Sequence, residues 1–222
     1  MNSEGIFFLL AGPSGAGKTV VLRTLLAGSR NLKKDISVTT RAPRPGEVNG
    51  QDYHFWSVER FEEELKDGAF LEHAIVHGRD WYGTLKRGVL KELDRGVDVI
   101  KDIDVQGAAQ VRKALPYPRS VMVFIAPTSP QELERRLSSR GTEDKDAFKR
   151  RLESVQPELA RLGEYDYLVL NQVIGEAAAE LEAIRRAEHA RRERREGEFR
   201  KAWRDVYKLD GRAPKARRAK RR

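Results

Sequence analysis

Runs of apolar residues alternate along the chain with segments in which apolar side chains recur every three or four positions. The apolar runs lie at about 6–11, 97–103, 121–126 and 167–170, and each has the length of one buried strand. An amphipathic segment at about 17–28 follows the first run, and similar helical patterns separate the others. Because strands that alternate with helices favour a parallel sheet covered on both faces, the pattern predicts an α/β fold.

Two further helices are expected from the residues at their ends. Ser57 is placed to cap a short helix that Gly68 closes. Thr84 is placed to cap a second helix, whose apolar positions share one face and which Gly96 ends. The first assignment rests on capping residues alone, and the second also on the spacing of its apolar positions.

The remaining segments follow the same patterns. Strands are predicted at about 35–39 and 70–76, with extended chain at 53–56. Two polar, charge-dense helices are expected between 130 and 162, and a long helix from about 175.

Charged residues are unevenly distributed. The 222 residues carry a net charge of +9, yet residues 185–222 alone hold 17 Lys/Arg against 6 Asp/Glu. The rest of the chain is close to neutral, so the high pI does not assign a nucleic-acid role to the whole protein. We expect one domain at 1–184, followed by a basic helical and flexible extension at 185–222.

Two features narrow the class of protein. The chain has no cysteine, which excludes a disulfide framework and a thiolate metal site. Its first apolar run is too short for a secretion signal or a membrane span. A cytoplasmic protein without membrane contact is therefore expected.

The segment after the first predicted strand fits a phosphate-binding loop. Residues 12–19 match the pattern G-x-x-x-x-G-K-[ST] between a strand and a helix. The glycines let successive backbone N–H groups face a chain of phosphates, while Lys18 reaches the outer phosphates and Thr19 ligates Mg²⁺. The predicted ATP-binding loop consists of Gly12, Pro13, Ser14, Gly15, Ala16, Gly17, Lys18 and Thr19.

A second basic segment indicates a second phosphate site. Arg41 and Arg44 lie about twenty residues after the loop, in the run 39–47. A guanidinium offers a planar fork for two phosphate oxygens, which lysine cannot copy. One site for a phosphate donor and one for an acceptor together suggest a phosphotransferase.

Both segments resemble guanylate kinases. Residues 12–19 and 37–53 carry most of the resemblance, which covers about 5–184. It implies a P-loop NTPase-type parallel sheet flanked by helices, with a GMP-binding insertion at about 35–85 and a helical lid at about 128–160. It also implies transfer of the γ-phosphoryl group of ATP to GMP or dGMP, with Mg²⁺.

The resemblance implies nine residues that bind GMP. Ser37 and Glu72 match positions that hydrogen-bond the guanine edge, where a carboxylate accepts from N1–H and from the exocyclic amine. Adenine has no such pair of donors, so this arrangement discriminates between the bases. The phosphate and the rest of the pocket are assigned to Arg41, Arg44, Tyr53, Tyr82, Thr84, Asp102 and Asp104.

It also implies residues for ATP and for catalysis. Arg136, Arg140 and Arg151 match lid arginines that close on the donor phosphates, where one arginine can be worth about 10³–10⁵ in rate. Positioning and charge stabilisation carry phosphoryl transfer, so no side-chain nucleophile is expected. The catalytic set is Lys18, Arg44, Arg140 and Arg151; Asn171 and Arg136 join the ATP-binding set, and Mg²⁺ is assigned to Thr19, with Asp102 through water.

Three positions depart from the family pattern. Residues 77–81 form a turn one residue longer than usual, and Asn171 is followed by Gln172 where an acidic residue is usual. Lys101 stands where an apolar or small residue is usual, and we expect it to extend outward from the strand end.

Two alternatives to a GMP kinase remain open. A non-catalytic guanylate-kinase-like module that binds phosphopeptides typically loses the loop lysine or the lid arginines, and this chain keeps Lys18 and Arg140. A kinase for another small phosphorylated acceptor does not need the guanine-reading pair of Ser37 and Glu72. For the tail, the alternatives are a solvated extension and weak, salt-dependent contact with nucleic acid or another polyanion.

Overall fold

A parallel sheet forms the centre of the molecule. The computed structural model describes residues 4–76, 78–138, 153 and 155–207. In this part of the chain the central sheet has five strands in the order β2-β7-β1-β8-β9, all parallel. The predicted α/β fold is confirmed. The strands are β1 (Phe7–Ala11), β2 (Leu32–Lys34), β7 (Asp98–Asp102), β8 (Ser120–Ala126) and β9 (Tyr167–Leu170).

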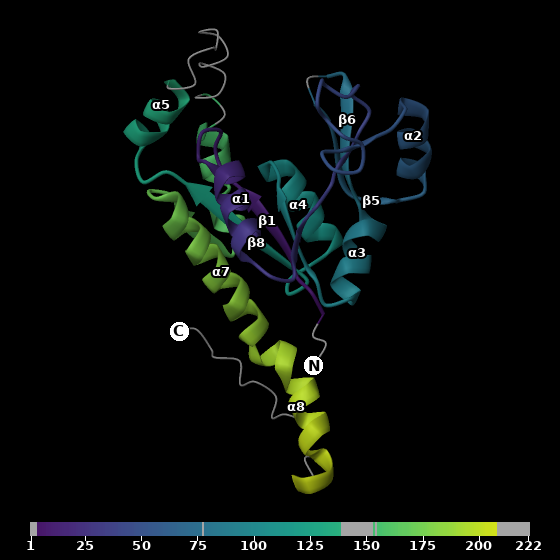
Figure 1. The fold of residues 1–222 in the computed structure, drawn as a ribbon, viewed down its shortest axis with the longest axis vertical. Helices are drawn as coiled ribbons and strands as arrows, with labels where there is room; N and C mark the ends of the chain where they lie inside the picture. Colours follow the sequence, from purple (N-terminus) through teal and green to yellow (C-terminus); the bar gives the residue numbers. More distant parts are fainter. Residues whose placement is uncertain (1–3, 77, 139–152, 154, 208–222) are drawn as a thin grey trace, which may run out of the picture.

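Helices cover both faces of this sheet, as Figure 1 shows. Alternate residues of β1 enter two separate apolar clusters: Phe8 and Leu10 face one, and Phe7 and Leu9 face the other. A strand buried on both faces reads as a continuous apolar run, which is why this strand was predictable. The helices α1 (Lys18–Gly28) and α7 (Ile174–Ala190) contribute to the first cluster, and α3 (Lys86–Asp94) and α4 (Val105–Ala114) to the second.

A second, smaller sheet lies beside the first. In the described residues it has four strands in the order β4-β3-β6-β5, and the helix α2 (Val58–Lys66) packs on it. The ring of Phe61 from α2 stacks between Phe70 and Trp81, with centroids 4.4 and 5.3 Å away. The strands are β3 (Val38–Thr39), β4 (His54–Phe55), β5 (Phe70–Val76) and β6 (Asp80–Leu85).

The predicted strand at 35–39 is wrong in its placement. The chain leaves the central sheet after Lys34 and enters the second sheet only at Val38. Asp35 and Ser37 lie between the two sheets, where both side chains hydrogen-bond Lys101. Residues 35–37 therefore cross from one sheet to the other and belong to neither, while Val38 and Thr39 form β3.

One predicted cap is confirmed and one is wrong. The Ser57 hydroxyl accepts from the backbone N–H of Arg60 at the start of α2. Thr84, by contrast, lies in β6 and donates to Glu72, while Leu85 precedes α3 without a side-chain cap. A hydrogen bond across the β5–β6 hairpin takes the hydroxyl that capping would have used.

The C-terminal third completes the described chain. The helix α7 continues past residue 185, the predicted domain boundary, to Ala190, and α8 projects away from the sheets (Figure 1). The domain boundaries stay a prediction. No helix in the described part of the chain is long and apolar enough to cross a membrane. The remaining elements are α5 (Pro130–Ser138), a 3₁₀ turn η1 (Leu162–Glu164) and α8 (Arg192–Tyr207).

Candidate active site

The phosphate loop begins where β1 ends and leads into α1. Gly12 and Gly17 have φ of 138° and 87°, in the region that favours glycine. A Cβ at Gly12 would lie 2.0 Å from the carbonyl oxygen of Ile125, and one at Gly17 would lie 2.4 Å from Asn171 Nδ2. The loop path therefore requires glycine at both positions. Lys18 Nζ donates to the carbonyl oxygens of Gly12 and Pro13, at 2.7 and 3.3 Å, so its ammonium lies along the loop.

Two oxygen-bearing side chains that could hold a divalent cation meet at the start of α1. The Thr19 hydroxyl donates to Asp102 Oδ2 at 3.2 Å, joining the phosphate loop to the carboxyl end of β7. Burial raises the pKa of Asp102, against the opposing influence of Lys18 and Thr19. A hydroxyl and a carboxylate whose charge is incompletely balanced suit Mg²⁺, which prefers oxygen ligands and commonly shares them with substrate phosphates.

Arg41 has its guanidinium oriented by three other groups. It forms a two-pronged ion pair with Glu47, with both N···O distances 2.9 Å, and its Nε donates to the Tyr82 hydroxyl at 3.1 Å. Its guanidinium carbon lies 5.4 Å from the centre of the Tyr53 ring. Glu47 also accepts from the backbone N–H of Arg44 at 2.7 Å, so one carboxylate organises the whole basic turn.

Hairpin pairing places Tyr82 and Thr84 in this site. In the register between β5 and β6, Glu72 is opposite Thr84, and Tyr82 also pairs with Thr39 of β3. Of the longer segment predicted at 77–81, Asp80 and Trp81 belong to β6 and pair with Val76 and Ile75, and residue 77 lies outside the described residues. Tyr53 is half-buried against Tyr82, and its burial raises the pKa of its hydroxyl.

Glu72 is a buried carboxylate, and one of its oxygens accepts a hydrogen bond from Thr84. Its Oε1 accepts from the Thr84 hydroxyl at 2.5 Å. Its Oε2 lies beside the first turn of α4, because a Cβ at Gly107 would be 3.3 Å from it. The positive end of a helix dipole stabilises a negative charge placed there. Oε2 of Glu72 thus faces the start of α4.

Lys101 is buried in the site, so the expected outward extension is wrong. Its Nζ donates to Asp35 Oδ2 at 2.8 Å and to Ser37 Oγ at 2.5 Å, and lies 3.7 Å from Glu72 Oε1. Two carboxylates and a hydroxyl attract the ammonium inward more strongly than water does outward.

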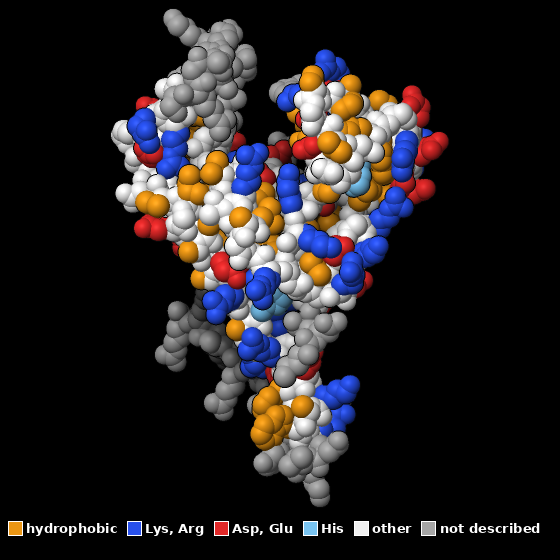
Figure 2. Space-filling view, viewed as in Figure 1, with side chains coloured by type: hydrophobic (Ala, Val, Ile, Leu, Met, Phe, Trp, Pro, Cys, Tyr) orange, Lys and Arg blue, Asp and Glu red, His pale blue; other side chains and the backbone are white. Residues whose placement is uncertain are grey.

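A cavity of about 210 Å³ connects the two halves of the site. Thr19 and Asp102 lie on its wall together with Ser37, Tyr53 and Lys101. In Figure 2 the surface is notched between the part that carries α5 and the part that carries the second sheet, with charged side chains gathered at the floor. Thr19 of the predicted donor loop and two residues of the predicted acceptor pocket, Ser37 and Tyr53, therefore line one space.

The helix α5 contacts the phosphate loop through Asn171. Asn171 is fully buried, and its Nδ2 donates to the carbonyl oxygen of Ala16 at 2.7 Å. Arg136 on α5 donates to the Asn171 carbonyl oxygen at 2.8 Å and pairs with Glu132 at 2.6 Å. Arg135 and Arg136 together lower the pKa of Glu132 to about 2.

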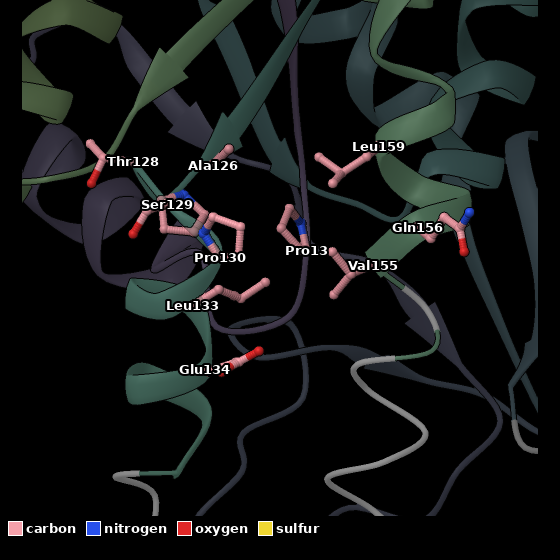
Figure 3. A pocket seen from close by; sticks show the side chains of 11 residues that line it. Pro13, Ala126, Thr128, Ser129, Pro130, Leu133, Glu134, Val155, Gln156 and Leu159 are labelled. Carbon is pink, nitrogen blue, oxygen red and sulfur yellow. The ribbon is translucent and has the colours of Figure 1, made fainter.

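A separate, largely apolar pocket of about 420 Å³ flanks the other side of the loop (Figure 3). Pro13 of the loop lines it together with Leu133, Val155 and Leu159. Glu134 is its single charged lining residue among those the structure describes. The described lining residues thus offer apolar contacts rather than a cation for phosphate.

Two groups of predicted residues stand apart from this arrangement. Asp104 caps α4, where its Oδ1 accepts from the backbone N–H groups of Gln106 and Gly107. That structural task accounts for its position without a ligand. Arg140 and Arg151 lie outside the described residues, so their predicted roles stay predictions.

Sequence reasoning missed four residues that hold the site together. Glu47 orients Arg41, Glu132 holds Arg136, and Asp35 and Lys101 form a buried pair. Glu47 lies within the basic run, and Glu132 lies four residues before Arg136 on a helix, so local spacing could have indicated both. Asp35 and Lys101 are 66 residues apart, and no local pattern joins them.

Comparisons with known proteins agree with this geometry. The family model described as guanylate kinase matches residues 6–188. The guanylate kinase of Dechloromonas aromatica is 45% identical over 82% of this chain and 89% of its own. The chain belongs to the guanylate kinase family. The guanylate kinase of Caldanaerobacter subterraneus is 40% identical over 87% of this chain and 93% of its own.

A solved structure supports the fold of this guanylate kinase family member. The crystal structure of the guanylate kinase from Anaplasma phagocytophilum aligns with a TM-score of 0.72 and 30% identity, covering 95% of this chain and 99% of that one. The resemblance predicted from residues 12–19 and 37–53 is confirmed.

Proposed function

We propose that this guanylate kinase transfers the γ-phosphoryl group of ATP to GMP or dGMP, giving ADP and GDP or dGDP. One observation carries the assignment to specific residues: Thr19 and Asp102 share a cavity wall with Ser37 and Tyr53. A donor held by the loop and an acceptor held by the second sheet would thus meet without intervening protein. The juxtaposition supplies the proximity on which phosphoryl transfer depends.

Each part of the site has a proposed task. The loop N–H groups and Lys18 hold the donor phosphates, with Arg136 and Asn171 beside them. Arg41, Arg44, Tyr53 and Tyr82 hold the acceptor phosphate, and Ser37, Glu72 and Thr84 read the base. We assign Mg²⁺ to Thr19 and Asp102, where the cation would neutralise charge on the donor phosphates. Arg140 and Arg151 are proposed to act on the transferring group.

These tasks define the chemistry that the chain performs. The Arg41 guanidinium, which Glu47 and the Tyr82 hydroxyl orient in advance, would align the acceptor phosphate through the Nη2 N–H that does not face Glu47. The base pocket selects the acceptor before transfer. Asp104 remains a proposed neighbour of the GMP pocket. We propose a cytoplasmic location, where ATP and nucleoside monophosphates are available together.

A coupled assay of ADP release with several acceptors tests this function. ATP and Mg²⁺ are supplied with GMP, dGMP, AMP, CMP, UMP and IMP in parallel. We expect turnover confined to GMP and dGMP, because the buried Glu72 carboxylate needs two ligand donors. Turnover with no nucleotide by a folded protein would instead support a phosphopeptide-binding module or a kinase for another acceptor.

Replacing Arg41 with lysine should weaken GMP binding. The R41K variant keeps the charge but loses the fork that pairs with Glu47 and faces Tyr53. We expect the KM for GMP to rise about tenfold or more, since a hydrogen bond to a charged group contributes about 1.5–3 kcal/mol. The KM for ATP should change little. Steady-state kinetics with each substrate varied in turn measure both, and an unchanged KM for GMP would remove Arg41 from the acceptor site.

Replacing Asn171 with alanine should destabilise the fold. The variant removes the 2.7 Å hydrogen bond to the carbonyl oxygen of Ala16, leaves the longer 3.5 Å one from Arg136, and opens space beside the loop. We expect a loss of about 1–3 kcal/mol in the free energy of unfolding, measured by urea denaturation. The matched control is Q172A, since Gln172 is the exposed next residue. Equal stability of the two variants would show that Asn171 does not anchor the loop.

For the basic extension we propose weak, salt-dependent binding of a polyanion. The rings of Phe199 and Trp203 are exposed on α8 and stack at 5.4 Å, close to several arginines. Affinity for single-stranded RNA is compared between the full chain and a chain lacking residues 197–222. Equal affinities would rule this proposal out.

A further inference from the structure

The buried lysine of β7 has no task in the function proposed so far. Lys101 is 6% exposed, and its ammonium lies among Asp35, Ser37 and Glu72, at 2.8, 2.5 and 3.7 Å. The chain pins two of these partners from elsewhere in the fold. The backbone N–H of Asp35 donates to the carbonyl oxygen of Ile100, and the carbonyl oxygen of Ser37 accepts from His54.

Two carboxylates face the Lys101 ammonium. Asp35 Oδ2 lies 2.8 Å and Glu72 Oε1 lies 3.7 Å from Nζ, so both form ion pairs with it. An ammonium has three donors and no acceptor. Toward Ser37 it can therefore act only as a donor.

This direction of donation fixes the role of the Ser37 hydroxyl. A hydroxyl has one proton to donate and two lone pairs to accept with. Since Ser37 Oγ accepts from Lys101 Nζ at 2.5 Å, its own proton is directed elsewhere. Ser37 lies on the wall of the 210 Å³ cavity, so its hydroxyl can donate its proton to an acceptor atom of a ligand there.

Guanine and adenine differ at the atom that such a hydroxyl would meet. Guanine carries an oxygen at position 6, which only accepts, whereas adenine carries an amine there, which donates. We propose that Lys101 is a positioning residue for base specificity: by donating to Ser37 it leaves the Ser37 proton for the 6-oxo group of the acceptor base. The inference rests on the proposed function and adds a residue that acts through Ser37.

Glu72 gives Lys101 a second effect on the same edge of the base. The ammonium lies 3.7 Å from Glu72 Oε1, the oxygen that Thr84 also bonds, so the charge of the carboxylate is balanced on the side away from Gly107. Glu72 then offers Oε2 as an acceptor for the donors of guanine. The ammonium of Lys101 thus leaves Ser37 as a donor and Glu72 as an acceptor. Guanine complements both, because its 6-oxo group accepts and its N1–H and exocyclic amine donate.

A merely structural role for Lys101 makes a different prediction. If the lysine served only to neutralise Asp35, removing both charges together would restore the pocket. The variants K101M and D35N/K101M distinguish neutralisation of Asp35 from positioning of Ser37. The double variant leaves no unpaired charge at position 35, so it is also less prone than K101M to unfold. S37A and S37A/K101M complete a cycle that reports whether Lys101 acts through Ser37.

The experiment measures kcat and KM for GMP, and turnover with AMP, in the wild type and all four variants. We expect the KM for GMP to rise about tenfold to a hundredfold in K101M and D35N/K101M, with kcat within about threefold, since a buried group loses its hydrogen-bond partner. The preference for GMP over AMP should fall by a similar factor. The KM for GMP of S37A/K101M should not exceed the higher of the two values measured for S37A and K101M.

Three results would overturn the inference. A wild-type KM for GMP in D35N/K101M would show that Lys101 serves Asp35 alone. Additive effects of S37A and K101M would show that the two residues act independently. A wild type inactive with GMP would refute the proposed function as well, whereas an active wild type with unaffected variants would refute only the role of Lys101.

Discussion

Replacing Lys18 with methionine is expected to lower kcat for GMP phosphorylation by about a hundredfold to a thousandfold, the usual effect of removing one preorganised donor from a charge-stabilising site. The ammonium of Lys18 lies along the phosphate loop and bonds only carbonyl oxygens of the loop among the contacts that the structure describes. Its charge is therefore available to the outer phosphates, whose negative charge shifts during transfer. The KM for GMP should change little, because the acceptor binds to other residues.

The matched control for this prediction is Lys33→Met. Lys33 is a half-exposed lysine that pairs with Glu92 on the surface, and exposed pairs of this kind contribute about 0–1 kcal/mol. We expect K33M to keep kcat within about twofold of the wild type. The free energy of unfolding of K18M, measured with urea, should match that of the wild type. The Lys18 hydrogen bonds join residues five and six positions apart within one loop. A K18M variant that kept wild-type kcat would show that the loop does not hold the donor.

Replacing Glu72 with glutamine should lower kcat/KM for GMP by about a hundredfold to a thousandfold, because a site built to bond polar groups loses most affinity when a buried group is left mispaired. The amide of glutamine places a donor where the carboxylate accepts, so it faces the N1–H or the exocyclic amine of guanine donor to donor. The loss of charge beside Lys101 adds to this effect, since Lys101 lies 3.7 Å from the carboxylate. Most of the change should lie in the KM for GMP.

Glu92→Gln is the control for the charge change, because Glu92 is a surface carboxylate paired with Lys33. The E92Q variant should phosphorylate GMP at the wild-type rate. An E72Q variant whose KM for GMP equals that of E92Q would contradict the assignment of the guanine edge to Glu72. Kinetics with ATP varied at saturating GMP show whether the donor site is unaffected.

The features that could be predicted from the sequence are those that local geometry determines. A strand buried on both faces is apolar along most of its length, so β1 and β8 could be predicted from their apolar runs. The loop glycines are required by the backbone path itself, with 2.0 Å left between a Cβ at Gly12 and the oxygen of Ile125. Both signals are contained within a few residues.

The features that were missed depend on residues distant in the chain. Thr84 has the local signature of a helix cap, but its partner Glu72, twelve residues earlier, is brought opposite it by the hairpin. Lys101 resembles a strand-end lysine that reaches water, yet Asp35 approaches it only because the chain crosses between the two sheets. Tertiary hydrogen bonds override local propensity at both positions.

The most direct test of the central claim is the fate of the γ-phosphoryl group. ATP labelled at the γ-phosphate is incubated with GMP, Mg²⁺ and the full chain, and the products are separated by chromatography. If the loop and the second sheet hold donor and acceptor around one cavity, the label appears in the β-phosphate of GDP, and its appearance depends on GMP. Label found in inorganic phosphate or on the protein, with none in GDP, would contradict direct transfer between two nucleotides in this site.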